Sequence, residues 1–182
     1  MNDPTPLPIP ELERLRQFEQ RVPGEWYANG FELHPPADYG DTAGIRTWSD
    51  EPEFLRCFIA FAQANGSGSI YALWRVDDRT DLAALPVVVF GDEGGVHVVA
   101  RSLRELFQLL ACDAWMWATI DSAYFYPDDD DEPSERHEDY VAWLKEELGL
   151  DPVADPDAVI DAAHEESGGT FDAWMRRYVE DY

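Results

Sequence analysis

The spacing of hydrophobic residues along this chain predicts helices in some segments and strands in others. Leu12, Leu15 and Phe18 recur every three residues, which predicts an amphipathic helix that ends at Pro23-Gly24. A second helix is expected over about residues 50–65, where an N-cap candidate and a proline precede apolar residues at helical spacing.

Three segments in the middle of the chain have the residue pattern of strands. Residues 69–76 read SIYALWRV, residues 86–90 read PVVVF and residues 96–100 read VHVVA. The loop GDEGG joins the last two, which predicts a hairpin whose acidic residues are simply solvated. Ser102 then opens a capping box, so a helix is expected after the third strand.

The last third of the chain is predicted to be helical, and it is the most acidic part. Helices are expected over about 138–148, over about 155–168 and in the final segment. Residues 128–182 hold 19 acidic and 4 basic residues, a net charge of -15. We therefore expect a core over residues 1–127, followed by an acidic loop and a helical extension that packs on the same domain.

The composition indicates a folded protein and restricts its partners. The 182 residues are 45% hydrophobic and 13% aromatic, so the chain can bury a core without metal ions or disulfides. The net charge is -25, which disfavours binding to nucleic acid and to anionic membranes but attracts basic partners. The chain shows no secretory signal and no apolar run long enough to span a bilayer, so a cytoplasmic protein is expected.

No motif in the chain predicts catalysis, a metal site or a cofactor. Cys57 and Cys112 lie in apolar, helix-like stretches and are expected to be reduced, buried thiols. The four histidines have neither helical pair spacing nor cysteine partners at zinc-finger spacing. An acidic run starts at Asp128, but Pro133 and Asp139 stand where a calcium loop of the EF-hand type needs Gly and Glu.

Acidic and aromatic side chains that lie close together in the sequence form the best candidate for a binding surface. The acidic run is expected in an exposed loop. Trp115 and Trp117 are two residues apart and would lie on the same side of a strand, where they would serve either the core or a binding hot spot. The candidate partner-binding residues are Asp128, Asp129, Asp130, Asp131, Glu132, Trp115, Trp117 and Tyr126.

The run from Ile59 to Asp113 carries a recognisable order of features. A helix is followed by a Gly-Ser turn, a strand with a Trp, the strand PVVVFGDEGG, a strand that ends in Val-Ala-Arg-Ser, and an amphipathic helix. This order resembles the SUKH superfamily (the Smi-one/Knr-four type). The resemblance implies a single α+β domain with a mainly antiparallel sheet packed by helices. It also implies protein binding, since many bacterial members are immunity proteins that neutralise toxins, often nucleases, and fungal members act as regulators. The family offers no catalytic residues.

The charge of the chain favours the same function. A nuclease toxin needs a basic cleft to hold phosphates, and a strongly acidic protein can fill that cleft. The charge would speed association, and aromatic contacts would hold the complex. We therefore expect a non-enzymatic immunity protein that neutralises a basic toxin. Two alternatives stay open: a regulatory or scaffold protein that binds an endogenous cell protein, and a metal-dependent hydrolase built from some of the 38 carboxylates.

Overall fold

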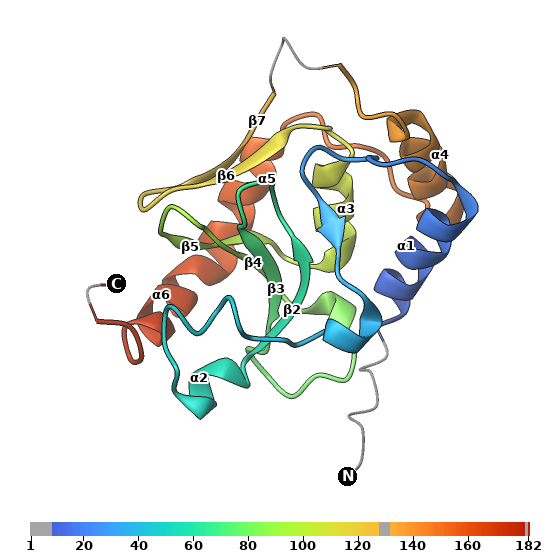
Figure 1. Ribbon diagram of the computed structural model, residues 1–182. Coiled ribbons are helices and arrows are strands. Elements are labelled where there is room, and N and C mark those ends of the chain that lie inside the picture. Colours follow the sequence, from blue (N-terminus) through green and yellow to red (C-terminus); the bar gives the residue numbers. More distant parts are fainter. Residues whose placement is uncertain (1–8, 128–131, 181) are drawn as a thin grey trace.

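A five-stranded antiparallel sheet lies at the centre of the protein, which a computed structural model describes over residues 9–127, 132–180 and 182 (Figure 1). The strand order follows the chain, and every neighbouring pair is antiparallel. The strands are β1 (Glu32–Leu33), β2 (Phe58–Gln63), β3 (Ile70–Trp74), β4 (Val87–Phe90) and β5 (Val96–Ala100). The predicted α+β fold with a mainly antiparallel sheet is thus confirmed.

Helices cover both faces of this sheet (Figure 1). The helices on one face are α1 (Pro10–Arg21), α3 (Leu103–Leu110) and α4 (His137–Leu148). A continuous helical segment made of α5 (Pro156–Ala163), the π-helical turn η3 (His164–Gly168) and α6 (Gly169–Met175) runs to the opposite face. Short helical turns complete the described part: α2 (Pro52–Leu55), η1 (Pro36–Asp38) and η2 (Leu82–Ala84). None of these described helices is both long and apolar enough to cross a membrane.

Side chains alternate between the two faces along each strand, so the sheet divides the core into two clusters. In β4, Val87 and Val89 join the cluster under α1, α3 and α4, whereas Val88 and Phe90 join the cluster that contains Phe171 of α6. All four β4 side chains are buried, and each such side chain contributes about 1.5–3 kcal/mol relative to an exposed one. Burial on both faces is why these strands are continuous apolar runs.

The predicted helix over residues 50–65 is wrong. Only Pro52–Leu55 are helical, and Phe58–Gln63 form strand β2. A strand that is buried on both faces has apolar residues at every position, so it also satisfies helical spacing. The register of β2 against β3 shifts between Ala60 and Ala62, and this bulge interrupts strict alternation further.

The other predicted helices and strands are present. The hairpin of β4 and β5 forms, and the Ser102 hydroxyl caps α3 by accepting the Glu105 N–H at 3.3 Å.

The two cysteines are free, as expected, but they are less buried than expected. Cys57 and Cys112 are both half-buried, and each follows the end of a helix. Partial burial raises the pKa of both thiols.

Replacing Phe171 by Ala tests how strongly α6 belongs to the core. The ring is fully buried and lies 4.9 Å, centroid to centroid, from Trp74 of β3. The change should lower the free energy of unfolding by about 3–5 kcal/mol in urea titrations. Val76→Ala is the control, since Val76 is exposed and should cost no more than about 0.5 kcal/mol. A loss below about 1 kcal/mol for Phe171→Ala would mean that α6 does not stabilise the sheet.

Candidate functional site

A separate two-stranded hairpin carries the aromatic residues that the sequence suggests for binding. Its strands are β6 (Trp115–Ala118) and β7 (Ala123–Tyr126), and they pair in antiparallel register. Two cross-strand pairs share the outer face of the hairpin: Trp115 with Tyr126, and Trp117 with Tyr124. We call these four side chains the aromatic face.

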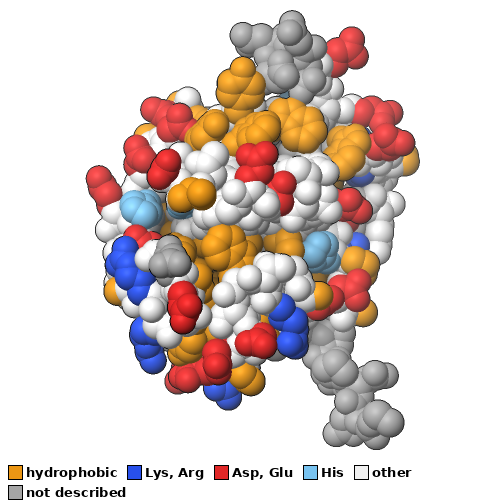
Figure 2. Space-filling model, turned by 60° about the vertical axis from the view of Figure 1, so that its left-hand side comes forward, with side chains coloured by type: hydrophobic (Ala, Val, Ile, Leu, Met, Phe, Trp, Pro, Cys, Tyr) orange, Lys and Arg blue, Asp and Glu red, His pale blue; other side chains and the backbone are white. Residues whose placement is uncertain are grey.

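Most of the aromatic face is open to solvent. The exposed fraction is 42% for Trp117, 37% for Tyr124 and 53% for Tyr126, and Ile120 in the turn is 77% exposed. Among the described residues, six large hydrophobic side chains are exposed, and these are four of them. Figure 2 shows hydrophobic side chains gathered along the top of the molecule, in the region of this hairpin. Exposed clusters of this kind mark interaction sites on soluble domains.

The inner face of the hairpin is buried, which fixes its orientation. Met116 and Phe125 form a cross-strand pair, and both pack into the larger core cluster. Because side chains alternate along a strand, the neighbours of Met116 and Phe125 in each strand point outward. One face holds the hairpin on the domain, and the other exposes Trp117, Tyr124 and Tyr126.

The amide of Asn65 ties the middle of the hairpin to the main sheet. Its Nδ2 donates to the Met116 carbonyl of β6 and to the Ser69 hydroxyl, both at 3.0 Å. Its Oδ1 accepts the N–H groups of Gly68 and Ser69 at 3.1 and 3.0 Å, in the turn between β2 and β3. Asn65 is buried and uses both of its donors and its acceptor, so a single side chain joins the turn between β2 and β3 to β6.

Asp113 fixes the base of the hairpin. Its Oδ1 accepts the Asn29 N–H at 3.0 Å and the Ser134 hydroxyl at 2.6 Å, and its Oδ2 accepts the Ser134 N–H at 2.7 Å. In return, Asn29 Nδ2 donates to the Asp113 carbonyl at 2.7 Å. Asp113 has a left-handed backbone with φ of 51°, a conformation that Asp tolerates better than most residues. The contacts join the loop before β1, the start of β6 and the segment before α4.

The tip of the hairpin packs on the turn between β4 and β5. His97 Nε2 lies 2.7 Å from the Thr119 carbonyl, and a carbonyl only accepts, so Nε2 is the donor. Gly95 has φ of +83°, and a Cβ there would lie 1.8 Å from the same carbonyl oxygen. Only glycine allows the two turns to approach this closely.

The prediction that the acidic residues of this turn are simply solvated is wrong for Asp92. Its Oδ1 accepts hydroxyl hydrogen bonds from Ser67 at 3.0 Å and Ser69 at 2.5 Å. Burial alone would raise the pKa of Asp92, but the Ser69 and Ser67 hydroxyls outweigh it and the pKa is lowered. The carboxylate therefore helps to hold the turns on which the hairpin tip packs.

Several carboxylates that are close to the hairpin in the sequence or in the neighbouring turn are exposed. Asp121 in the hairpin turn and Glu132 after β7 are exposed, as is Glu93 in the neighbouring turn. The predicted binding residues Asp128, Asp129, Asp130 and Asp131 lie outside the described residues, and Asp128 follows Tyr126 by two positions in the sequence.

The structure brings together three of the candidate residues and adds two that sequence reasoning missed. Trp117 and Tyr126 are exposed, whereas Trp115 is half-buried with its ring packed over Gly30. Tyr124 and Ile120 were not predicted. The alternation Tyr-Phe-Tyr over 124–126 mirrors Trp-Met-Trp over 115–117 and is the signal that could have identified Tyr124.

A hollow of about 540 Å³ adjoins the turn of the hairpin. Ile120 and Asp121 line it together with His97 and His164. Tyr182 closes one side, where its hydroxyl donates to the Val96 carbonyl at 2.7 Å. Within the described ranges, no group of three or more His, Cys, Asp or Glu side chains is placed to hold a metal ion.

Comparison with known proteins finds no match among family models, curated proteins or solved structures. The resemblance to the SUKH superfamily therefore stays a prediction from residues 59–113, and its first element, expected as a helix, is strand β2.

Changing Asn65 to Ala should loosen the hairpin and lower stability. It removes the hydrogen-bond partner of the Met116 carbonyl and of three turn N–H groups, those of Ser67, Gly68 and Ser69. We expect the free energy of unfolding to fall by about 2–3 kcal/mol and the β6 amides to exchange faster with deuterium. Asn65→Asp separates the two roles, because it keeps the acceptor for the turn but loses the donor to β6. Unchanged exchange in β6 for both variants would refute the anchoring role.

The lowered pKa of Asp92 makes a specific prediction for acid unfolding. Because the folded pKa lies below the unfolded value of about 3.9, the stabilisation is complete above that value and is lost as the pH falls through the folded pKa. Urea unfolding measured from about pH 5 to pH 2.5 should therefore show a shallower loss of stability for Asp92→Asn than for wild type. The neighbouring exposed residue provides the control variant, Glu93→Gln. Identical slopes for wild type and Asp92→Asn would contradict the assignment.

Proposed function

We propose that this protein is a non-enzymatic binding protein that captures a basic protein partner on the aromatic face, as an immunity protein captures a toxin. The observation that carries the proposal is the exposure of Trp117, Tyr124 and Tyr126 on a hairpin that is held at its base, middle and tip. A cytoplasmic location is part of this proposal.

The aromatic face has the properties of a binding hot spot. Trp and Tyr are enriched among the residues that dominate interface energies, because each covers a large area and keeps a polar group for hydrogen bonding. The strand register already fixes the backbone of the four side chains. Little conformational entropy is then lost on binding, so more of the contact energy remains as affinity.

The charge of the chain defines the kind of partner. A net charge of -25 attracts a basic protein over a distance of about 8–10 Å at moderate salt and repels nucleic acid. Asp121, in the turn of the hairpin, and Glu132, six residues after Tyr126, are exposed carriers of this charge. Charge of this kind mainly raises the association rate, whereas buried aromatic contacts mainly slow dissociation.

The resemblance of residues 59–113 to the SUKH superfamily supports a toxin as the partner. A nuclease toxin fits the charge argument, since its basic cleft holds a polyanion that an acidic surface can replace. An endogenous cell protein with a basic surface would satisfy the same chemistry, and a test of toxicity separates the two.

Paired variants test the proposal in a pull-down from lysate of the source organism. Wild-type protein should retain one basic protein in near-equal amount through a moderate-salt wash. Replacing both Trp117 and Tyr126 by Ser should speed dissociation of that protein at least about 30-fold, the effect of losing a hot-spot contact of about 2 kcal/mol. Trp26→Ser is the matched control, because Trp26 is exposed but lies outside the hairpin. Retention of only many weak, salt-sensitive partners, or equal dissociation from all three proteins, would contradict the proposal.

Binding measurements on the same complex test the role of the acidic run at residues 128–131. Changing Asp128, Asp129, Asp130 and Asp131 together to Asn should slow association and flatten its salt dependence, while dissociation stays unchanged. Unchanged association would reject the run as part of the site. Growth assays then identify the class of partner. A retained protein that is toxic alone and harmless with this chain supports the immunity function, whereas a harmless one supports the regulatory alternative.

A further inference from the structure

A glycine directly follows each asparagine that the structure describes. Asn29-Gly30 lies before β1, and Asn65-Gly66 lies in the turn between β2 and β3. Asparagine followed by glycine is the sequence in which a side-chain amide most readily loses ammonia, because glycine has no Cβ to shield its backbone nitrogen. Both amides also hold the hairpin of β6 and β7, at its base and at its middle. A chemical change at either amide therefore acts on the hairpin.

The loss of ammonia proceeds through a ring. The glycine nitrogen attacks Cγ of the asparagine, its proton is lost to hydroxide, and a bond between nitrogen and Cγ closes a succinimide. The bond between Cγ and Nδ2 breaks, and Nδ2 takes a proton from water and leaves as ammonia. Water then opens the ring at one of its two carbonyl carbons, which gives aspartate or isoaspartate. The net reaction consumes water, releases ammonia and needs no enzyme.

The Oδ1 atom of Asn65 is surrounded by hydrogen-bond donors that favour the first step. Negative charge develops on this oxygen as the nitrogen attacks Cγ. The N–H groups of Ser67, Gly68 and Ser69 point to it at 3.2, 3.1 and 3.0 Å. The Ser67 hydroxyl adds a fourth donor at 2.9 Å. Fixed donors around a developing oxyanion are the arrangement by which enzymes accelerate acyl transfer.

The turn that carries this amide is open to water although the amide itself is buried. Asn65 is buried, whereas Gly66, Ser67 and Gly68 are all exposed. Hydroxide and water therefore reach the residues that would form and open the ring. The Asn65 side chain is held in one position by its bonds on both sides, so the reacting groups stay close together.

The same dipeptide at Asn29 lacks these surroundings. Among the described residues, the only donor to Asn29 Oδ1 is the Ser134 hydroxyl at 3.4 Å, and this hydroxyl lies closer to Asp113 Oδ1, at 2.6 Å. Gly30 is buried, so solvent reaches it less than it reaches the turn between β2 and β3. The fold thus favours the reaction at Asn65 over the reaction at Asn29.

We propose that Asn65 is a site of spontaneous deamidation, at which this fold accelerates conversion to aspartate or isoaspartate and thereby releases the hairpin. The product lacks Nδ2, so the Met116 carbonyl and the Ser69 hydroxyl lose their donor. The new carboxylate also lies near that of Asp92, because the Ser67 hydroxyl contacts Oδ1 of both residues, and like charges repel. This inference is independent of the proposed protein-binding function.

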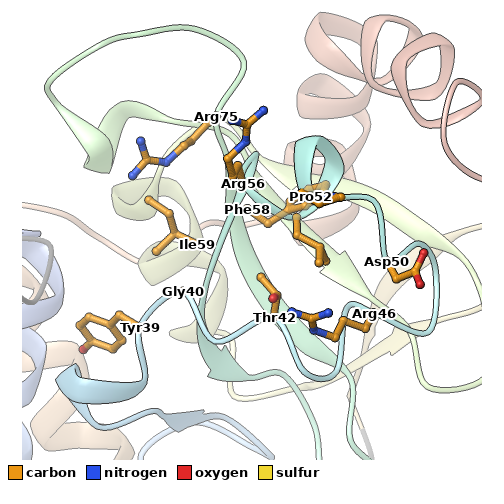
Figure 3. Close-up of a pocket in the computed structure, with 11 residues that line it drawn as sticks. Tyr39, Gly40, Thr42, Arg46, Asp50, Pro52, Arg56, Phe58, Ile59 and Arg75 are labelled. Atoms are coloured by element: carbon orange, nitrogen blue, oxygen red, sulfur yellow. The ribbon is translucent and has the colours of Figure 1, made fainter. Parts of the chain in front are cut away.

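Ageing the folded protein in mildly alkaline buffer, followed by peptide mass spectrometry, tests the proposal. Trypsin cleaves after Arg56 and Arg75, which flank the end of β2 and β3 opposite the turn (Figure 3), so Asn65 and Asn29 are released on separate peptides. The acid should form at least about tenfold faster at Asn65 than at Asn29 in the folded protein. In urea the two rates should be similar, because both residues stand in Ala-Asn-Gly. Conversion at Asn65 that is no faster than at Asn29 in the folded protein would overturn the proposal.

Gly66→Ala is the matched variant, because it shields the attacking nitrogen and leaves the donors to Oδ1 in place. A Cβ at Gly66 would meet its nearest neighbour, the Trp115 ring, at 3.8 Å, and the backbone there is not left-handed, so the variant should fold. Conversion at Asn65 should slow, and conversion at Asn29 should not change. Equal conversion at Asn65 in wild type and variant would refute the ring mechanism.

Hydrogen exchange of the aged proteins tests the release of the hairpin. The β6 amides of aged wild-type protein should exchange faster in proportion to the fraction converted, whereas those of Gly66→Ala aged in the same way should keep their slow exchange. Converted wild-type protein with unchanged exchange in β6 would show that deamidation does not release the hairpin.

Discussion

The buried amide of Asn65 is the contact on which the arrangement of this protein depends most. It closes the turn between β2 and β3 and reaches the Met116 carbonyl of β6. A buried amide that loses its partners costs about 1–3 kcal/mol per group, so the turn and the hairpin are stabilised together. Asp113 and His97 add fixed points at the base and the tip. The hairpin is therefore part of the domain although its strands do not join the main sheet.

The way in which the hairpin is attached gives its two faces different properties. The inner face of the hairpin contributes apolar burial to the domain, and the outer face keeps aromatic side chains exposed in a fixed register. Exposed aromatic surface promotes aggregation unless something opposes it, and a net charge of -25 keeps copies of the chain apart. Under the proposed function, the same charge favours a partner of opposite sign. Apolar burial, exposed aromatic surface and negative charge thus belong to different parts of the molecule: the core, the aromatic face and the carboxylates.

The sequence predicted the elements whose local pattern is unambiguous. The strands around GDEGG, the Ser102 cap and the helix from Pro10 follow from turn, cap and periodicity rules. Strand β2 was not predicted, because burial on both faces removes the alternation of apolar and polar residues that distinguishes strands from helices. The structural role of Asn65 could not be predicted either, since its partner Met116 is 51 positions away in the chain.

Hydrogen exchange of the protein with and without its retained basic partner tests the central claim most directly. The account predicts that bound partner slows deuterium uptake in residues 115–126, with smaller effects on the neighbouring turn at 91–95. Dissociation of the partner should restore the uptake of the free protein. Protection confined to other segments, with residues 115–126 exchanging as in the free protein, would show that the aromatic face is not the binding surface.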